Sequence, residues 1–491
     1  MSEKRTNLEF HGGKCLSLLP LILSIIFAIY FLGFARVYDT IALALGGFVA
    51  IIIGSFFAKS IEDYWNAVIR GMSDEIGNTI AIILIVVGIF GKMMSRGQIT
   101  EGFIWIGDTI HIGGSTLCIF AFIITSIIAT STGSSVSTIM TMIPILLPVA
   151  AIMNANIPTF IGAVLSGALF GDSIGPVSDV TIASSQTQEY SHKSGMPDIG
   201  GVVRARIKYS MTAFVVTCIL FLIFGSSGAN GIMQEDLMAQ YSNPKGLFML
   251  IPMILLLICA FKTKNIFLSA TVGIFSGTIV GLLSGLMTPA DILVVNDGVL
   301  GGFIIDGINN MAGTILFVYA SVGMLGILKS SGMMDSLVTK LSQSKITKSV
   351  IGTELIIAFG SALTCLMIGS SNGPACLMFG SIGNEIGKKA NLHPYRRANL
   401  IAAFTSSLPI MNPFSSVFII LTMGAVNSVC EEYPFIGTVN PMSIPPYMFF
   451  CMIFPLVFLV SIFTGWGREY EGENGEVIKY TKIPKDSKRN A

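Results

Sequence analysis

The sequence predicts an all-α polytopic membrane protein built from two inverted-topology repeats with broken helices. Three observations predict this fold class. Of the 491 residues, 52% are hydrophobic and only 12% are charged, whereas soluble domains carry about 25% charged residues. Apolar runs long enough to cross a bilayer recur along the chain. The chain also resembles itself at a nearly constant spacing.

The composition excludes several function classes. The net charge of +1 provides no global field that would attract nucleic acid. Most of the eight cysteines lie inside apolar runs and no Cys-x-x-Cys pair occurs, so we expect neither a zinc site nor a disulfide framework. The sequence has no pattern typical of zinc hydrolases, serine hydrolases or nucleotide-binding proteins, so we expect neither an enzyme nor a primary pump.

Eight apolar runs are expected to cross the membrane as single helices. The lysines and arginines of short loops mark the cytoplasmic side. They place both termini and the loops at 193–208, 262–264, 340–348 and 388–397 in the cytoplasm, and the segment 288–313, which has no Lys or Arg, outside. We expect a multi-pass protein of the cell membrane, surrounded by lipid, and keep a homodimer open. The eight runs are 15–33, 40–58, 78–95, 209–225, 246–261, 266–287, 314–330 and 446–465.

Two parts of the chain match each other with a shift of 235 to 237 residues, as in Gly88 and Gly323, Gly133 and Gly369, and Pro176 and Pro413. The first copy follows a loop placed inside and the second follows a loop placed outside, so the copies should run in opposite directions. A duplication in the same direction is the alternative. The expected domains are N-terminal helices 1–77, repeat 78–208, connecting helices 209–312, repeat 313–430, and a last helix with a tail at 431–491.

In each copy an apolar helix runs into a Gly-Ser-Ser segment, at residues 133–135 and 369–371. Small and hydroxyl-bearing residues continue a helix poorly, and a second apolar leg follows each segment. Each segment is expected to be the tip of a re-entrant hairpin, which gives about 10 crossings plus two hairpins. A kink between two full crossings, with up to about 14 crossings, leaves the loops on the same sides.

The next helix of each copy is interrupted as well. Gly171, Gly175 and Pro176 break the first, and Pro409 and Pro413 break the second. Unwound backbone at membrane depth must be buried in protein or line a cavity, where freed carbonyl groups can hold a cation. The side chains suited to a hard ion such as Na⁺ are Ser178, Thr181, Asn412 and Ser415. Breaks that are satisfied by neighbouring helices are the alternative.

Asp172 and Asp179 lie at the first break and have no acidic counterpart in the second copy. A carboxylate inside a membrane costs about 3 kcal/mol unless it is paired, hydrated or protonated. Such a group can hold either a proton or a cation, which suits exchange between the two. Alternatively, either aspartate caps a half-helix. Among other ionisable residues, we expect Lys92 to snorkel, Glu354 to reach the interface and His393 to be solvated.

The segment 171–181, GDSIGPVSDVT, resembles the signature GD-x-x-SP-x-SDTT of the NhaC-type sodium/proton antiporter family, part of a broader ion-transporter superfamily. The stretch TSTGSSVST at 130–138 is similar to a Gly/Ser-rich stretch of that family. Gly175, Val180 and Ser173 depart from the pattern, and Ser173 matters most because many members have Lys there. The resemblance covers about residues 75–430 and implies two inverted units whose hairpins and broken helices meet at the site.

We therefore expect an ion-coupled secondary transporter, foremost a Na⁺/H⁺ antiporter in which Asp172 exchanges the ions and Asp179 assists. The alternative is Na⁺- or H⁺-coupled transport of an amino acid or small organic anion on the same scaffold. A passive channel suits inverted repeats less well. No cofactor is expected beyond Na⁺ and H⁺ as coupling ions, with Asp172 and Asp179 as Na⁺ ligands. The expected site residues are Asp172, Asp179, Ser178, Thr181, Thr132, Gly133, Ser134, Ser135, Gly369, Ser370, Ser371, Asn372, Asn412, Ser415 and Ser416.

Overall fold

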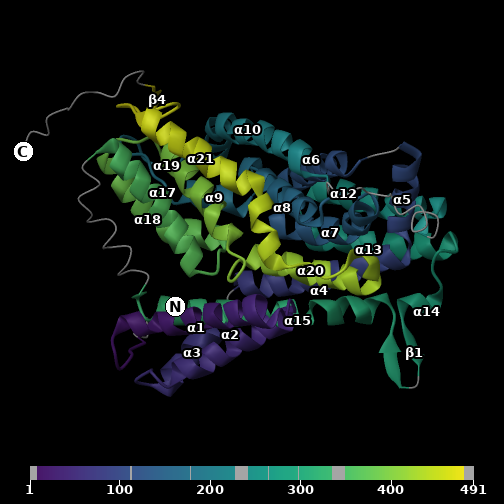
Figure 1. Ribbon diagram of the computed structural model, residues 1–491. Coiled ribbons are helices and arrows are strands. Elements are labelled where there is room, and N and C mark those ends of the chain that lie inside the picture. Colours follow the sequence, from purple (N-terminus) through teal and green to yellow (C-terminus); the bar gives the residue numbers. More distant parts are fainter. Residues whose placement is uncertain are drawn as a thin grey trace, which may run out of the picture.

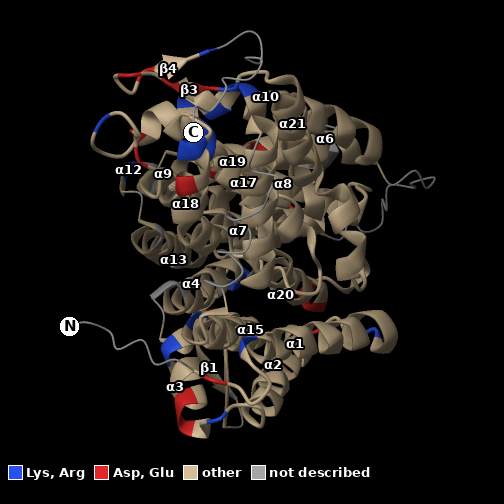
Figure 2. Ribbon diagram, turned by 90° about the vertical axis from the view of Figure 1, so that its left-hand side faces the viewer, with Lys and Arg blue, Asp and Glu red and all other residues tan. Residues whose placement is uncertain are grey.

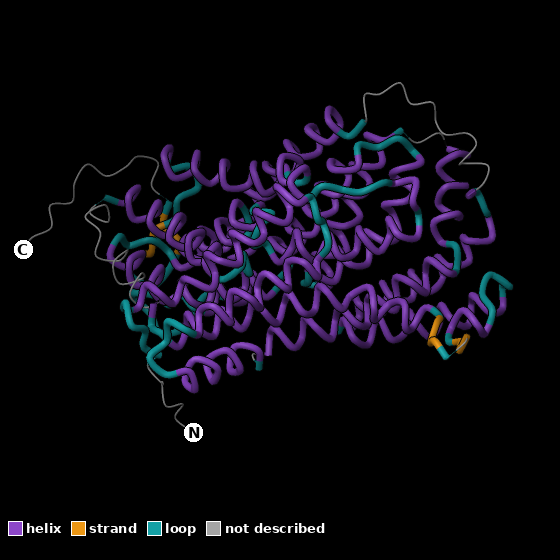
Figure 3. The backbone as a smooth tube through the Cα atoms, turned by 60° about the horizontal axis from the view of Figure 1, so that its bottom comes forward, coloured by secondary structure: helices purple, strands orange, loops and turns teal. Residues whose placement is uncertain are grey.

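The computed structural model describes residues 8–73, 75–110, 113–176, 178–226, 241–263, 265–296, 298–333 and 349–479. These residues are mostly helical, and most helices run along the longest dimension of the molecule (Figure 1 and Figure 3). Eight helices among them are long and apolar enough to cross a membrane. Several basic residues used above to orient the loops, among them Lys264, Lys340, Lys345 and Lys348, lie outside the described residues.

The single-crossing runs predicted from the sequence are helices in the structure. Two further helices, α3 (Ile61–Met72) and α5 (Ile99–Ile110), were not predicted, because 12 residues with acidic side chains in the first turn are too short and too polar for a crossing. The predicted crossings are α1 (Leu19–Ile29), α2 (Thr40–Ser55), α4 (Glu75–Arg96), α10 (Ile199–Phe224), α12 (Leu250–Thr263), α13 (Ile266–Leu283), α15 (Phe303–Ser330) and α21 (Phe449–Thr464).

Two short β-hairpins mark opposite ends of the molecule (Figure 1). At one end β1 (Val294–Asn296) pairs with β2 (Val299–Gly301), beside α14 (Pro289–Ile292). At the other end β3 (Tyr470–Glu471) pairs with β4 (Val477–Ile478), after α21. We call these the β1 end and the β4 end. Figure 2, which faces the β4 end, shows charged residues on the segments around β3 and β4, while the helices are mostly uncharged.

A layer made of α1, α2, α3 and α15 lies along one side of the molecule (Figure 1). The backbones of α15 and α3 approach so closely that a Cβ on Gly326 would lie 2.2 Å from the Ala67 carbonyl oxygen. α4 crosses α15 in the same way, because a Cβ on Gly88 would lie 2.5 Å from the Gly307 oxygen. Membrane helices use small residues at such interfaces, where backbone contact replaces the hydrophobic effect. Glycines thus join the layer to the rest of the molecule.

The site is built by two matching sets of helices. The first set is α6 (Gly114–Thr132), α7 (Ser135–Ile152), α8 (Ile157–Ile174) and α9 (Asp179–Gln186). The second is α17 (Val350–Met367), α18 (Asn372–Lys389), α19 (Pro394–Thr405) and α20 (Val417–Glu432). The helices of the second set start at residues 350, 372, 394 and 417, against 114, 135, 157 and 179, which gives shifts of 236, 237, 237 and 238. The predicted internal repeat is therefore confirmed.

In each set the first two helices form a hairpin. A Cβ on Gly114, the first residue of α6, would lie 2.6 Å from the Cα of Ala155, which follows α7. The start of α6 and the end of α7 therefore lie together and form the base of the hairpin. In the second hairpin a Cβ on Gly387, near the end of α18, would lie 3.4 Å from Ile357, in the first half of α17. The legs of each hairpin are therefore antiparallel.

The long helix α10 shows that the two hairpins start from opposite ends of the molecule. Ser226, just after α10, forms an antiparallel bridge with Ala155 at the base of the first hairpin. Tyr209, in the N-terminal half of α10, donates a hydrogen bond to the Gly467 carbonyl oxygen at 2.8 Å. Close to Gly467, Tyr470 forms a bridge with Leu392 at the base of the second hairpin. The two bases lie toward opposite ends of one helix, which confirms the inverted arrangement.

This topology predicts that the two hairpin bases face opposite sides of the membrane. In a cysteine-free background, Gly113→Cys and Lys389→Cys place single thiols at exposed positions beside the first and the second base. A membrane-impermeant maleimide added to right-side-out and to inverted vesicles should label each variant in one preparation, and in opposite ones. Labelling of both thiols from the same side would contradict the inverted arrangement.

Candidate functional site

The first hairpin tip is a sharp reversal that only a few residues can form. Gly133 ends α6 with φ +66°, in the left-handed region where glycine is favoured. Ser134 then caps α7, because its Oγ accepts a hydrogen bond from the Ser137 backbone N–H at 3.4 Å. The N-terminus of α7, with Ser135 in its first turn, therefore points toward the interior of the protein.

The first break separates α8 from α9. The Gly175 N–H donates to the Gly171 carbonyl oxygen at 2.8 Å and ends α8, and Ser178 caps α9 through the Thr181 N–H at 3.5 Å. α8 packs directly against α6, since a Cβ on Gly171 would lie 2.5 Å from the Ser126 carbonyl oxygen. Because Gly171 has no side chain, α8 approaches α6 closely, and the next residue, Asp172, lies beside the first hairpin tip.

Asp172 lies where the first hairpin tip meets the first break. Its side chain is 5% exposed, and one carboxylate oxygen accepts a hydrogen bond from the Ser135 hydroxyl at 2.6 Å. The Ser178 hydroxyl and the Asn372 amide lie close enough to interact with this carboxylate. Asn372 belongs to the tip of the second hairpin, so both repeats contribute to the environment of one buried acid.

The second hairpin tip meets the second break in the same way. The Ser370 hydroxyl donates to the Pro409 carbonyl oxygen at 2.6 Å, in the 3-10 helix η5 (Leu408–Met411). The Gly369 oxygen accepts from the N–H of Val417, the first residue of α20, at 3.3 Å. The Asn372 amide donates to Ser406 at 3.3 Å. The Gly-Ser-Ser segments are therefore hairpin tips inside the protein, bound to the broken helices.

The remaining predicted site residues either form hydrogen bonds within their own segment or line a groove. Ser416 caps α20 just as Ser178 caps α9, and Thr132 bonds within α6. Asn412 donates to Ser415 at 2.9 Å. Ser415 and Gly369 line a groove between the second tip, α1 and α15.

Asp179 takes the first position of α9 and is exposed. It is not the cap of that helix, because Ser178 fills that role. A carboxylate at a helix N-terminus is favoured by the helix dipole. A Cβ on Gly373 would lie 3.7 Å from that of Asp179, so Asp179 also faces the second hairpin tip.

Sequence reasoning placed Arg206 in a basic cytoplasmic loop, and that prediction is wrong. Arg206 lies within α10 and is 0% exposed. Its guanidinium donates to the Ser173 carbonyl oxygen at 2.7 Å and to the Thr181 hydroxyl at 3.2 Å, on both sides of the first break. Ser173 stands where many members have Lys, and Arg206 brings a positive charge to the Ser173 backbone from another helix. Only a charge within the helix 199–224 could have signalled this.

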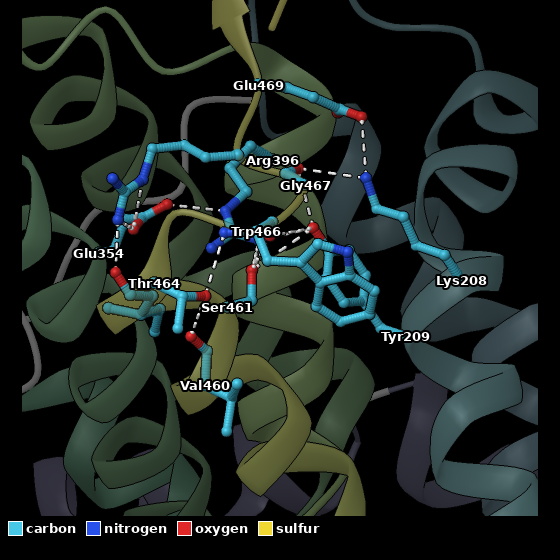
Figure 4. A network of polar contacts seen from close by, with 12 residues as sticks. Lys208, Tyr209, Glu354, Arg396, Val460, Ser461, Thr464, Trp466, Gly467 and Glu469 are labelled. Carbon is cyan, nitrogen blue, oxygen red and sulfur yellow. Dashed lines mark hydrogen bonds and ion pairs between the residues drawn. The ribbon is translucent and has the colours of Figure 1, made fainter. Parts of the chain in front are cut away.

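Glu354 does not reach an interface as predicted, but lies at the centre of a buried network at the β4 end (Figure 4). It is 0% exposed and binds Arg396 at 2.7 Å and Arg468 at 2.6 Å. Arg396 also donates to Ser461 and Tyr209, at 2.9 and 3.1 Å. The network connects the second hairpin to α19, α10 and the segment after α21.

Two other predictions about ionisable residues are also corrected. Lys92 does not snorkel to lipid headgroups, because its Nζ binds Glu432 at 3.0 Å in a groove between α4, α7 and α20. His393 is not solvated but 1% exposed. Its Nδ1 accepts from the Tyr395 N–H at 3.2 Å, and its Nε2 lies 3.4 Å from the Gly475 carbonyl oxygen. Burial lowers the pKa of His393 to about 4.

The chemistry available at the breaks is that of hard oxygen atoms. The Asp172 carboxylate lies beside the Ser135 and Ser178 hydroxyls and the Asn372 amide, which come from both repeats. No cluster of three or more His, Cys, Asp or Glu suited to a metal ion occurs among the described residues. Such a site can bind a proton or a weakly held ion or solute.

Inverted hairpins that meet broken helices around a buried acid define a membrane transporter of small ions or solutes. The chain matches the model of the Na⁺/H⁺ antiporter family over residues 14–225 and 197–452. It belongs to that family of multi-pass membrane proteins and is an ion-coupled antiporter.

Three curated relatives show the range of names in this group. A malate-2H⁺/Na⁺-lactate antiporter of Bacillus subtilis is 27% identical, over 65% of this chain and 70% of its own. The Na⁺/H⁺ antiporter NhaC of Alkalihalophilus pseudofirmus is 26% identical, over 60% of this chain and 66%, just under two thirds, of its own. The arginine/ornithine antiporter ArcD of Halobacterium salinarum is 22% identical, over 87% of this chain and 88% of its own.

The buried network predicts that Glu354→Gln is strongly destabilising. The change leaves two arginines without their carboxylate, which costs about 3–5 kcal/mol. The unfolding temperature of the detergent-solubilised protein should fall markedly. Glu189→Gln is the control, because Glu189 is 58% exposed in its pair with Lys388 and should contribute less than about 1 kcal/mol. Equal shifts in the two variants would show that the buried network is not stabilising.

His393 predicts a loss of stability in acid. Its pKa of about 4 lies below the ordinary histidine value of 6.5, so protonation favours the unfolded state. The stability held by neutral His393 is fully present above pH 6.5 and is lost as the pH falls toward 4. Asn can replace the Nδ1 acceptor as a helix cap, so His393→Asn should unfold with a flatter pH dependence between these values. An unchanged slope would exclude this role.

Proposed function

We propose that the protein exchanges Na⁺ for H⁺ at Asp172. The observation that carries this proposal is a single buried carboxylate that accepts a hydrogen bond from Ser135 and has neutral polar side chains of both repeats beside it. No lysine, arginine or histidine lies within 4.0 Å of Asp172 in the described part of the chain. An ionised carboxylate at this depth is costly, so a bound proton or a bound cation stabilises it, and each displaces the other.

The surrounding oxygens suit the cation-bound state. Ser135 and Ser178 can turn their hydroxyl lone pairs toward Na⁺, because a hydroxyl group donates or accepts. Asn372 can offer its amide oxygen after a rotation of its side chain. Carbonyl groups freed by the break at Gly175 and Pro176 add further ligands. Asp179, at the exposed start of α9, would attract cations toward the site.

The two hairpins give a means of alternating access. They reach the site from opposite ends of the molecule, and each tip binds the break of its own repeat. Movement of one hairpin base relative to α4, α10 or α15 would open one side, and movement of the other would open the opposite side. The ion pair of Lys92 with Glu432 and the Glu354 network would hold the two sides closed in turn.

A second candidate is the exchange of a small organic anion or amino acid, coupled to Na⁺ or H⁺. Two relatives bear names of this kind, a malate-2H⁺/Na⁺-lactate antiporter and an arginine/ornithine antiporter. The second break has no acid, and its tip instead presents Ser371 and Asn372 at the N-terminus of α18. A helix N-terminus favours a carboxylate group, which a pure cation site would not require.

The proposal predicts that purified protein in liposomes collapses an imposed pH gradient when Na⁺ is added. Asp172→Asn should reduce this flux by about 100-fold or more, because the amide cannot bind a proton or neutralise a cation. Asp179→Asn is the matched control and should retain flux within about tenfold, since its carboxylate lies outside the buried site. Fluorescence of an internal pH dye measures both.

If intact wild-type protein moves no protons with Na⁺, simple Na⁺/H⁺ exchange is excluded. The same liposomes are then loaded with malate, lactate, arginine or ornithine to test the second candidate. A Na⁺-dependent flux that Asp172→Asn leaves unchanged would show that the exchange site lies elsewhere.

A further inference from the structure

Arg206 occupies a position that the exchange scheme above does not use. Its side chain is 0% exposed, in the N-terminal third of α10. Nε donates to the Asn399 side-chain oxygen at 2.8 Å, and one terminal nitrogen donates to the Ser173 carbonyl oxygen at 2.7 Å and the Thr181 hydroxyl at 3.2 Å. The guanidinium therefore lies between the first break and α19 of the second repeat.

The charge of Arg206 is not balanced by a direct ion pair. Among the described residues, no carboxylate lies within 4.0 Å of it, whereas Arg396 binds Glu354 at 2.7 Å and Arg397 approaches Glu471 at 3.9 Å. The other terminal nitrogen of Arg206 is buried and has no hydrogen-bond partner within the described residues. An unpaired buried charge costs several kcal/mol, so a neighbouring negative charge is expected to offset it.

Asp172 is the carboxylate that interacts electrostatically with Arg206. The two residues are linked through the backbone, because the Ser173 carbonyl group that Arg206 binds directly follows Asp172. Asp172 and Arg206 are both buried, where charges act on each other over longer distances than in water. The ionised carboxylate and the guanidinium therefore stabilise each other without direct contact.

We propose that Arg206 is a fixed internal counter-cation that weakens Na⁺ binding at Asp172. The inference rests on the proposed exchange at Asp172. When the site is empty, Arg206 compensates the carboxylate. When Na⁺ binds, the carboxylate is neutralised and Arg206 loses that compensation, so the guanidinium opposes binding. A transport site must release its ion as well as bind it, and a positive charge placed behind the site favours release.

Arg206 acts on the ion through Asp172, so it is a positioning residue and its test needs a readout beyond stability. The readout is the half-saturating Na⁺ concentration in a thermal-shift titration of the purified full-length protein. Choline chloride keeps the ionic strength constant. Removing the charge with Arg206→Gln should lower this concentration about tenfold, whereas Arg206→Lys, which keeps the charge, should stay within about threefold of wild type. Arg204→Gln on the same helix, at an exposed position, should leave it unchanged.

A second variant keeps the test decisive if Arg206→Gln does not fold. Asn399→Asp places a carboxylate where the amide oxygen now lies 2.8 Å from Nε. It pairs the guanidinium while changing few atoms, so it should also tighten Na⁺ binding several-fold.

The outcomes separate the two claims. Tighter Na⁺ binding in Arg206→Gln or in Asn399→Asp, with Arg204→Gln at the wild-type value, supports the inference. If wild type is stabilised by Na⁺ and neither variant changes the half-saturating concentration, the inference is overturned while exchange at Asp172 stands. If Na⁺ stabilises neither wild type nor the variants, Na⁺ exchange at Asp172 is overturned and this inference with it.

Discussion

A helix that stops inside a membrane leaves N–H and carbonyl groups without partners, and this constraint organises the whole molecule. Four half-helices end near the centre. At the first break Arg206 binds the Ser173 carbonyl group and Ser178 caps α9, and at the second break Ser370 of the hairpin tip binds the Pro409 carbonyl group. Because lipid offers no hydrogen bonds, the hairpins and the broken helices cannot exist separately. The site therefore forms where the backbone groups freed by the breaks find their hydrogen-bond partners.

The two repeats share a backbone but differ in chemistry. Their helices begin at nearly constant spacing, and Ser178 and Ser416 cap equivalent half-helices. Yet only the first break has acids, and the buried Arg206 binds the backbone at that break. In the proposed scheme, symmetry would provide two alternative openings, while the one asymmetric carboxylate would provide a single exchange group. An antiporter needs both, because two ions must compete for one site that faces each side in turn.

Local patterns in the sequence predicted much of this arrangement. The Gly-Ser-Ser tips, the Gly-Pro breaks and Asp172 could all be predicted from short segments. Glycine and proline interrupt a helix locally, and an acid inside an apolar run indicates a functional site whatever its tertiary partners are. Arg206 and Glu354 were misread because their partners are distant: Asn399 is 193 residues from Arg206, and Arg468 is 114 from Glu354. A basic residue near the end of an apolar run is normally assigned to a loop, and only tertiary contacts show that it is buried.

The central claim is that one ion binds where both repeats meet at Asp172. High-resolution cryo-electron microscopy of the protein in sodium chloride and in choline chloride tests it most directly. The account predicts a density peak present only with Na⁺, bounded by oxygens of Asp172, Ser135, Ser178 and Asn372. A sodium-dependent peak at Asp179 or Glu432 instead, or identical maps at saturating Na⁺, would contradict it.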